Sequence, residues 1–402
     1  MNSSININII GGGRWARVIL EVISRIADNS DIITVYSKNN SLGMIEWISS
    51  KNLGRKILVF EDLPKKFTTD KTAVIIVNAA RDHEKFILAS LTAGASVLVE
   101  KPITLSYISG VKIAKAAKKL EKHLSSAHVF LFATYFINFS KLVLNAGKIN
   151  RIDIHWEDPM VEDRYGEKKN YDSGLTVLSD WLPHVLSMIS AIVPIKDFIF
   201  LSIELNRGGA SVTLDILANH IPCRIILTRN GKSRKRLMNV NTETKVLKLN
   251  FSKEPGTIYD GLIEINGDNE WGINKSPLES MLKAFLKSVS NNIFDERLNI
   301  EIGLKSLKVI DCAMIEYKKK QFAWLIDDLT INYSNHQRIS LNENIFYALS
   351  EIFQSKRALN LEELNKKIEL FLFKVSKIKA EVWHSDLIKV DFNDAINKIN
   401  DL

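Results

Sequence analysis

The order of apolar and polar residues over the first 125 positions alternates between two patterns. Short stretches rich in β-branched residues are typical of buried strands, whereas longer stretches with apolar residues at every third or fourth position predict helices. The predicted strands are residues 5–10, 32–37, 72–80 and 96–100, and the predicted helices are residues 15–27 and 83–94. Strands that alternate with helices form parallel sheets covered by helices on both faces. We therefore expect an α/β domain here, with a doubly wound parallel sheet of the Rossmann type.

From about residue 127 the pattern changes to short stretches in which apolar and polar residues alternate. This alternation, with Gly and Asn turns between the stretches, predicts an open and mainly antiparallel sheet. The predicted strands are residues 151–159, 198–205, 209–218, 222–231 and 244–251. Residues 276–292 and 300–320 have the helical spacing expected of helices that pack on one face of such a sheet. Together they predict an α+β domain.

The chain continues beyond this second pattern with three more stretches of helical periodicity, at residues 340–356, 361–378 and 385–399. Their apolar faces need cover, from the body of the protein, a second subunit or a partner protein. We expect a Rossmann dinucleotide-binding domain, an α+β domain for substrate binding and oligomerisation, and a helical C-terminal extension, over residues 1–126, 127–327 and 328–402.

Composition narrows the class of protein. The 54 Lys and Arg residues outnumber the 46 Asp and Glu residues, but they are spread along the chain, so we expect no nucleic-acid partner. Two cysteines, Cys223 and Cys312, and the lack of a Cys/His cluster predict no metal site and a reducing compartment. The sequence contains no long apolar run and begins without a leader pattern, so we expect a cytoplasmic protein with no membrane contact.

The stretch NIIGGGRWARVILEV, residues 8–22, joins the first predicted strand to the first predicted helix. Gly11, Gly13 and Ala16 fit the pattern GxGxxG/A of dinucleotide-binding loops. In that pattern the first Gly permits a tight turn, the second lets the backbone approach a pyrophosphate, and the third small residue allows close helix–strand packing. The helix N-terminus would supply N–H groups to the phosphates. A tight turn without a nucleotide is the alternative interpretation.

The end of the second predicted strand bears on the choice of cofactor. NAD-binding folds usually place an Asp or Glu there to bind the ribose 2′-hydroxyl. This chain has Ser37 and Lys38 instead, and Arg14 follows the glycine loop. A hydroxyl and two cations suit a 2′-phosphate, which an acid would repel, so we expect NADP(H).

A later run of residues resembles the Gfo/Idh/MocA oxidoreductase family, which includes glucose–fructose oxidoreductase and inositol dehydrogenase. The run consists of Asn78, His83, Ala89, Ala93-Gly94, Val97 and Glu100-Lys101-Pro102. A second family signature is matched by SGLTVLSDWLPHVLSMI, in which Asp180 and His184 are four residues apart. The likeness covers roughly residues 5–320.

The resemblance implies roles for these residues. Lys101 and His184 would form an acid/base pair for the proton that accompanies hydride transfer, and Asp180 would bind substrate or orient the site. The resemblance also suggests a cis bond between Lys101 and Pro102. The predicted cofactor site comprises Gly11, Gly13, Arg14, Trp15, Ser37, Lys38, Asn78, His83, Glu100 and Lys101.

The chain departs from the family pattern in the loop before Asp180. Only Gly174 remains of a longer glycine run, with Tyr171 in the place of the usual aromatic residue. Two further groups of residues are candidates for the cleft. One strand ends in Trp156, Glu157 and Asp158, which either face the cleft or have a buried structural role. A polar loop that contains Arg164, Tyr165 and Tyr171 would cover the substrate.

The favoured function is an NADP-dependent oxidoreductase that acts on a small polar substrate such as a sugar, a cyclitol or a nucleotide-sugar. One alternative is a thiazolinyl imide reductase of siderophore biosynthesis, in which the C-terminal helices would dock a carrier protein. Another is a non-catalytic regulator that binds the cofactor. The alternating strands also predict a homodimer or homotetramer joined through an apolar open sheet face.

Overall fold

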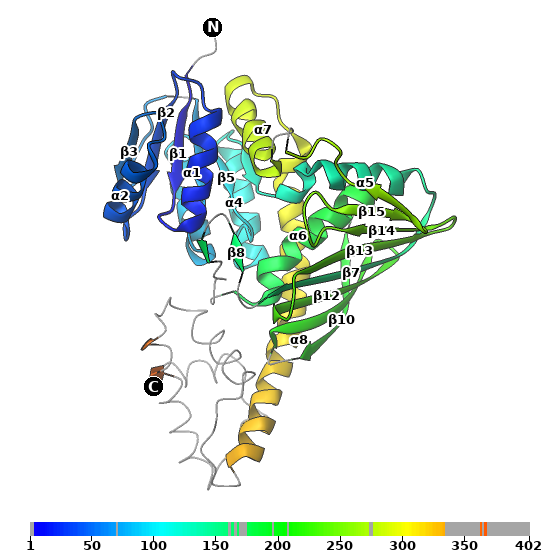
Figure 1. Cartoon of the computed structure of the whole chain (residues 1–402). Coiled ribbons are helices and arrows are strands. Elements are labelled where there is room, and N and C mark those ends of the chain that lie inside the picture. The colour runs from blue at the N-terminus through cyan, green and yellow to red at the C-terminus, as the bar shows by residue number, and fades with distance from the viewer. Residues whose placement is uncertain are drawn as a thin grey trace.

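A computed structural model describes residues 4–69, 71–159, 162–164, 167–168, 175–194, 197–206, 209–272, 276–333, 362–363 and 366–367. In Figure 1 the N-terminal domain, in blue and cyan, lies beside a second domain in green, and the long helix α8 extends beyond both. The cis bond between Lys101 and Pro102 that the resemblance suggests is present. The predicted C-terminal helices and the residues Tyr165, Tyr171 and Gly174 lie outside the described residues, apart from two short helical pieces.

The N-terminal sheet has the strand order β3-β2-β1-β4-β5-β6, and every neighbouring pair is parallel. This is the doubly wound Rossmann order that the sequence predicts. Its strands are β1 (Asn6–Ile10), β2 (Ile32–Tyr36), β3 (Ile57–Phe60), β4 (Thr72–Ile76), β5 (Ser96–Val99) and β6 (Leu124–Ser126). Its helices are α1 (Arg14–Ile26), α2 (Ser41–Lys51), the 3₁₀ helix η1 (Ala80–Asp82), α3 (His83–Thr92) and α4 (Tyr107–Lys119).

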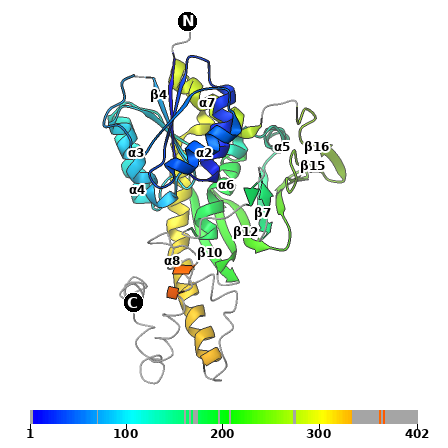
Figure 2. The same cartoon turned by 60° about the vertical axis from the view of Figure 1, so that its left-hand side comes forward.

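Helices cover both faces of this sheet because successive strand residues point to opposite sides. On β4, Ile75 packs into the apolar cluster that includes α1, whereas Val74 and Ile76 pack into the cluster that includes α3 and α4. Figure 2 shows α3 and α4 on one side of the sheet and α2 on the other. Strands buried on both faces read as continuous apolar runs, which explains why the sequence revealed them.

The second sheet has the order β10-β11-β12-β7-β13-β14-β15-β16. Its neighbouring pairs are antiparallel except β12 and β7, which agrees with the predicted mainly antiparallel sheet. The strands are β7 (Ile149–Pro159), β10 (Phe198–Asn206), β11 (Ser211–Ala218), β12 (Ile221–Gly231), β13 (Lys235–Thr242), β14 (Val246–Asn250), β15 (Thr257–Asp260) and β16 (Ile263–Asn266). A separate hairpin pairs β8 (Asp163–Arg164) with β9 (Glu167–Lys168).

The part of the chain after β6 also contains α7 (Pro277–Asn291), which packs against α1 and η2 (Val129–Phe132), and the 3₁₀ helix η4 (Glu296–Leu298). Helices α5 (Thr134–Leu144), α6 (Val177–Ile192) and α8 (Ile300–Tyr333) pack on the inner face of the second sheet. A row of apolar residues crosses the sheet beneath them, namely Leu214, Ile225, Ile154, Met238 and Leu249. Helix α8 continues without a break through residue 328, where the sequence placed a domain boundary.

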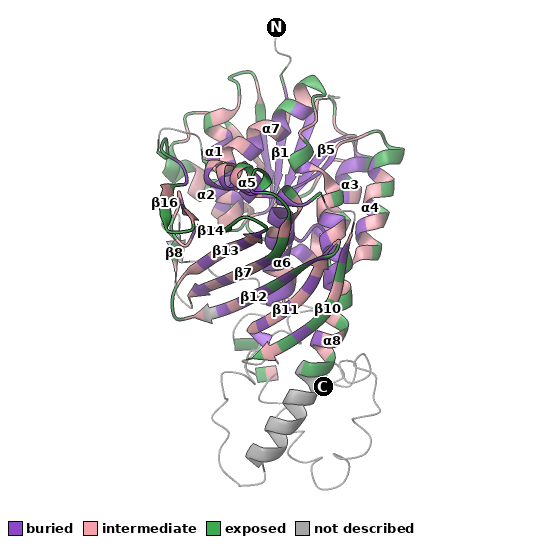
Figure 3. Ribbon diagram, turned by 90° about the vertical axis from the view of Figure 1, so that its right-hand side faces the viewer, coloured by how far each residue is buried: buried purple, intermediate pink, exposed green. Residues whose placement is uncertain are grey.

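The outer face of the second sheet is more polar than the sequence suggested. The row opposite the apolar one consists of Asp215, Arg224, Asp153, Asn239 and Lys248. Figure 3 shows this face open, with buried positions alternating with partly exposed ones along each strand. The oligomer stays a prediction, but it cannot rest on a broad apolar surface across these central strands.

Candidate active site

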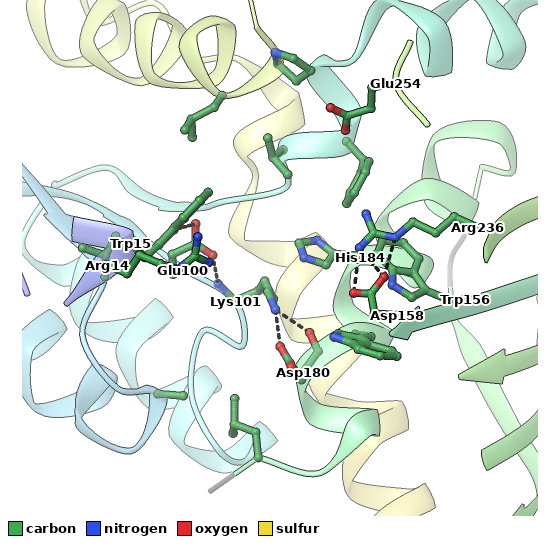
Figure 4. Close-up of a pocket in the computed structure, with 18 of the residues that line it drawn as sticks. Arg14, Trp15, Glu100, Lys101, Trp156, Asp158, Asp180, His184, Arg236 and Glu254 are labelled. Carbon is green, nitrogen blue, oxygen red and sulfur yellow. Dashed lines mark hydrogen bonds and ion pairs between the residues drawn. The ribbon is translucent and has the colours of Figure 1, made fainter. Parts of the chain in front are cut away.

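A cavity of about 470 Å³ lies between the two domains and collects most of the residues that the sequence singles out. The Rossmann domain contributes the start of α1 and the segments that follow β4 and β5, and the second domain contributes α6 and the ends of β7, β12 and β13. Figure 4 shows Arg14, Trp15, Glu100 and Lys101 facing Asp180, His184 and Trp156 across this space. Predicted site residues that line the cavity are Arg14, Trp15, Asn78, His83, Glu100, Lys101, Asp180 and His184.

The glycine loop has the geometry that a dinucleotide requires. Gly11 has a φ of +150°, and a Cβ there would lie 3.1 Å from Val77 Cγ2. A Cβ on Gly12 would collide with Ser37 Oγ, so the middle glycine, which the motif leaves variable, is also restricted. A Cβ on Gly13 would meet nothing within 4 Å, and Gly13 leaves the N-terminus of α1 without a side-chain cap. Open space beside uncapped N–H groups fits a pyrophosphate.

The rim beyond β2 holds residues that the sequence predicts to contact a 2′-phosphate. Ser37 is 5% exposed and packs against Gly12, whereas Lys38 is exposed to solvent. Asn40 Nδ2 donates a hydrogen bond of 2.6 Å to the carbonyl oxygen of Gly12 and so fixes the loop against this rim. Ser37 and Lys38 therefore lie beside the glycine loop but are not among the residues that line the central cavity.

His83 has a supporting position. Its Nδ1 lies 2.8 Å from the carbonyl oxygen of Pro102, and its Nε2 lies 3.1 Å from the carbonyl oxygen of Asn78. The ring is buried and bridges the segments that follow β4 and β5. Its main structural effect is to hold Asn78 and the Lys101–Pro102 segment in place at the edge of the cavity.

Glu100 is tied to the glycine loop. Trp15 Nε1 donates to Glu100 Oε1 at 2.8 Å, and the backbone N–H of Lys101 donates to Glu100 Oε2 at 3.1 Å. Burial raises the pKa of the Glu100 carboxyl, and the charge of Lys101 and the bond from Trp15 oppose that rise. The Trp15–Glu100 bond therefore joins the start of α1 to the end of β5, next to Lys101.

Lys101 and Asp180 form the central contact between the two domains. Lys101 Nζ lies 2.5 Å from Asp180 Oδ1 and donates to the Asp180 carbonyl oxygen at 2.7 Å. Both side chains are mostly buried, with 15% and 14% of their surface exposed. Asp180 occupies the first turn of α6, where Thr176 caps the helix and a negative charge is favoured.

His184 lies one turn further along α6, on the same side as Asp180. Its ring stacks on Trp156 with an interplanar angle of 7° and a centroid distance of 5.8 Å, and Phe130 meets it edge-on at 5.1 Å. These rings fix its orientation. Of the strand-end residues considered in the sequence, Trp156 and Asp158 line the cavity, whereas Glu157 lies outside it and accepts from the backbone N–H of Lys232.

Two buried arginines at the cavity were missed by sequence reasoning. Arg236 donates to Asp158 from Nε and Nη2 of its guanidinium, which lies over the Trp156 ring at 4.2 Å. Arg229 lies 3.4 Å from Asp180 Oδ2. Both arginines are 2% exposed, and they come from β12 and β13, where the sequence around "TRNGKSRKR" reads as a charged turn.

Comparison with known proteins agrees with this arrangement. The model of an oxidoreductase family with an NAD-binding Rossmann fold, Gfo/Idh/MocA, matches residues 5–128. Inositol 2-dehydrogenase of Serratia proteamaculans is 30% identical over 122 residues, which are 30% of this chain and 35% of that protein. The chain spans 35 to 60% of the length of the curated relatives that it matches.

Two solved structures share the fold over most of their length. UDP-N-acetylglucosamine 3-dehydrogenase GnnA from Acidithiobacillus ferrooxidans has a TM-score of 0.62 at 15% identity, over 78% of this chain and 97% of that one. KijD10, a 3-ketoreductase from Actinomadura kijaniata in complex with TDP-benzene and NADP, gives the same TM-score, identity and coverage. Residues 5–128 therefore match the Rossmann domain of the Gfo/Idh/MocA oxidoreductase family, and the similarity to the solved structures shows that the two-domain fold is shared.

Proposed function

We propose that this protein is an NADP(H)-dependent oxidoreductase that transfers a hydride to or from a carbon bearing oxygen in a small polar substrate. The observation that carries the proposal is the placement of Lys101. It stands at the carboxyl end of a parallel strand, where α/β sheets bind ligands, and it shares one cavity with Trp15 beside the glycine loop. Asp180 and His184 face it from the second domain.

The chemistry follows from the groups that surround the cavity. The nicotinamide, when bound, supplies or accepts the hydride. Glycine-loop backbone and the N-terminus of α1 would hold its pyrophosphate, and Trp15 and Asn78 would border the ring. Hydride transfer to a carbonyl leaves negative charge on oxygen, which needs a proton from the protein. Lys101 and His184 are the proposed proton donors and acceptors, and Asp180 holds the Lys101 ammonium.

The preference for NADP(H) rests on the rim beyond β2. Ser37 and Lys38 lie there beside the glycine loop, and Arg14 follows the loop. A 2′-phosphate would gain charge-assisted hydrogen bonds from these groups, on the order of 1.5–3 kcal/mol each. Lys38→Met should weaken NADPH binding by about 10-fold or more and leave NADH binding unchanged, because only the 2′-phosphate contact is lost. Titrating both proteins with both cofactors measures this, and equal losses for NADPH and NADH would reject the assignment.

The substrate class is a sugar, a cyclitol or a nucleotide-sugar. Inositol dehydrogenases are relatives in sequence, and one structural neighbour described above is by name a dehydrogenase of the nucleotide-sugar UDP-N-acetylglucosamine. Asp180, His184, Lys101 and Asn78 supply polar groups at the cavity, while Trp156, Trp181 and Phe130 supply ring surfaces. Polar groups beside aromatic rings suit a polyol ring.

The proposal is tested with a substrate panel and NADPH oxidation or NADP⁺ reduction as the readout. We expect turnover with at least one sugar, cyclitol or nucleotide-sugar. Thiazoline-type imines, free and attached to a carrier, belong in the same panel. Activity on an imine alone would replace the proposed substrate class with imide reduction. Tight NADPH binding without turnover on any member would favour a regulator.

A further inference from the structure

Arg229 is a buried cation at the cavity that the proposed reaction has not yet used. It belongs to β12 on the inner face of the second sheet, and 2% of its surface is exposed. Resting on the proposed function, we infer that Arg229 is a positioning residue: it holds the Asp180 carboxylate against Lys101 and so fixes the Lys101 ammonium at the reacting oxygen.

The contacts hold Asp180 from two sides. Its Oδ1 receives Lys101 Nζ at 2.5 Å, and its Oδ2 lies 3.4 Å from Arg229 Nη2. Arg229 is itself anchored, because its Nη1 donates to the carbonyl oxygen of Leu175 at 3.0 Å. With the guanidinium fixed in this way, the carboxylate cannot rotate without losing one of its cations. The ammonium of Lys101 is thereby held in one place at the cavity.

The charges of the Lys101, Asp180 and Arg229 side chains determine how they can act on a substrate oxygen. Lys101 and Asp180 alone would form a neutral pair, whose carboxylate would offset the ammonium. With Arg229 in place, two cations share one carboxylate, so the carboxylate offsets the Lys101 ammonium less than it would in an isolated pair. A cation held in a fixed position stabilises negative charge that develops on a substrate oxygen beside it.

A neighbouring ion pair shows that the arrangement is specific. Asp158 is bound by two nitrogens of the same guanidinium, with contacts of 2.8 to 3.1 Å, so Arg236 and Asp158 form a bidentate ion pair. Arg229 contacts Asp180 Oδ2 at the longer distance of 3.4 Å, while Lys101 binds the other carboxylate oxygen. The first pair fits a structural role, whereas the second divides one carboxylate between a fixed cation and one that can exchange its proton.

The experiment compares Arg229→Met, Arg229→Lys, Asp180→Asn and the double variant Arg229→Met/Asp180→Asn in the full chain. The matched control is Arg224→Met, because Arg224 lies on the same strand, faces the opposite side of the sheet and pairs with Asp215 at 3.8 Å. For each protein, kcat and KM are measured with a substrate that the wild type turns over, together with the NADPH dissociation constant and the melting temperature.

We expect Arg229→Met to lower kcat by at least about 10-fold, within the range of coupling found inside one ion-pair network. NADPH binding should not change, and Arg229→Lys should recover much of the loss because it restores the charge. The double variant should be little worse than Asp180→Asn, since Arg229 acts through Asp180. Arg224→Met should match the wild type.

Other outcomes would overturn the inference. One is a wild-type kcat in Arg229→Met. Another is a double variant whose loss of kcat equals the product of the losses in Arg229→Met and Asp180→Asn. A third is a well-folded Arg229→Lys whose kcat does not recover. If Arg229→Met does not fold, the inference is tested by the kcat of Arg229→Lys alone. A wild type that turns over no member of the panel would reject the proposed function and the inference together, whereas wild-type turnover with an unaffected Arg229→Met rejects the inference only.

Discussion

Lys101 illustrates how one side chain is placed for chemistry by several independent contacts. Its backbone N–H binds the buried carboxyl of Glu100, and its ammonium binds both the carboxylate and the carbonyl oxygen of Asp180. Glu100 is held in turn by Trp15 at the start of α1. Lys101 is thus fixed by the Rossmann domain on one side and by the second domain on the other, which suits the proton transfer proposed for it.

Removal of the proposed proton donors should separate binding from chemistry. Lys101→Ala and His184→Ala should each lower kcat by about 10²–10⁴-fold, the usual scale for general acid–base catalysis. Both should bind NADPH normally, because the phosphate contacts lie at the glycine loop. Lys101→Arg should also fail, since arginine does not release its proton. Steady-state rates and cofactor titration measure the two effects, and near-wild-type turnover in Lys101→Ala would reject the mechanism.

The elements differ in how far the sequence predicts them. Strand β1 and the glycine loop are recognisable because a short run rich in β-branched residues meets a glycine pattern. Strand β13 was not predicted, although it lies near the centre of its sheet. In its sequence KRLMNVNT, inward and outward positions alternate as in a strand. However, outward positions carry Lys and Asn, and the strand follows a charged turn. Arg236 lies on this strand. Because the sequence pattern did not reveal the strand, it could not indicate that Arg236 reaches the cavity.

Side-chain partners are the second feature that the pattern did not supply. The spacing of Asp180 and His184 predicts a shared helix face, and both residues line the cavity. Nothing local indicates that Arg229, 49 residues after Asp180, would reach the same carboxylate. This pair depends on the packing of β12 against α6, and a contact between elements so far apart in the sequence cannot be predicted from a local residue pattern.

The glycine loop offers a test that separates folding from cofactor binding. Gly13→Ala should leave the melting temperature unchanged, because its Cβ meets no protein atom within 4 Å and its φ of −90° suits alanine. If that space holds the pyrophosphate, the same methyl group should lower NADPH affinity by about 10-fold or more, through lost charge-assisted hydrogen bonds. Cofactor titration and thermal unfolding measure the two quantities.

Gly12→Ala is the matched comparison within this loop. Its Cβ would collide with Ser37 Oγ, so we expect a loss of stability of about 1–3 kcal/mol from overpacking. A Gly13→Ala protein that binds NADPH as tightly as the wild type would show that the phosphates lie elsewhere. Equal melting temperatures for Gly12→Ala and the wild type would contradict the packing of Ser37 against the loop.

At the scale of the whole molecule, the two domains meet through buried polar groups as well as apolar ones. The cavity occupies most of this junction, and the segment from β6 to η2 passes behind it. No helix in the described part of the chain is long and apolar enough to cross a membrane. The polar outer face of the second sheet leaves oligomerisation as a prediction, which light scattering at micromolar concentration would decide.

His128 makes this junction sensitive to acid. Its ring is fully buried behind the Lys101–Pro102 segment, beside Ser126 and Pro183, and neither ring nitrogen has a hydrogen-bond partner among the residues that the structure describes. Burial lowers the pKa of His128 from 6.5 to about 3, because the charged ring would lose its hydration. The unfolded chain therefore binds a proton at pH values where the folded chain does not.

The direction of the pH dependence follows from this difference. Between pH 6.5 and about 3 the unfolded state carries the extra proton on His128, so acid favours unfolding over that range, and above pH 6.5 the contribution is constant. Each pH unit within the range costs at most about 1.4 kcal/mol of stability. His128→Leu fills a similar volume, removes the titrating group and leaves no buried nitrogen unpaired.

We therefore expect the melting temperature of His128→Leu to exceed that of the wild type by a margin that widens as the pH falls from 7 to 4. Thermal unfolding of both proteins at several pH values measures this margin. His220→Leu is the matched control, because His220 lies exposed in the turn between β11 and β12. A margin that stays constant with pH, or that His220→Leu reproduces, would show that His128 takes up its proton in the folded protein. The junction would then have to open to water around His128 without unfolding, which its complete burial argues against.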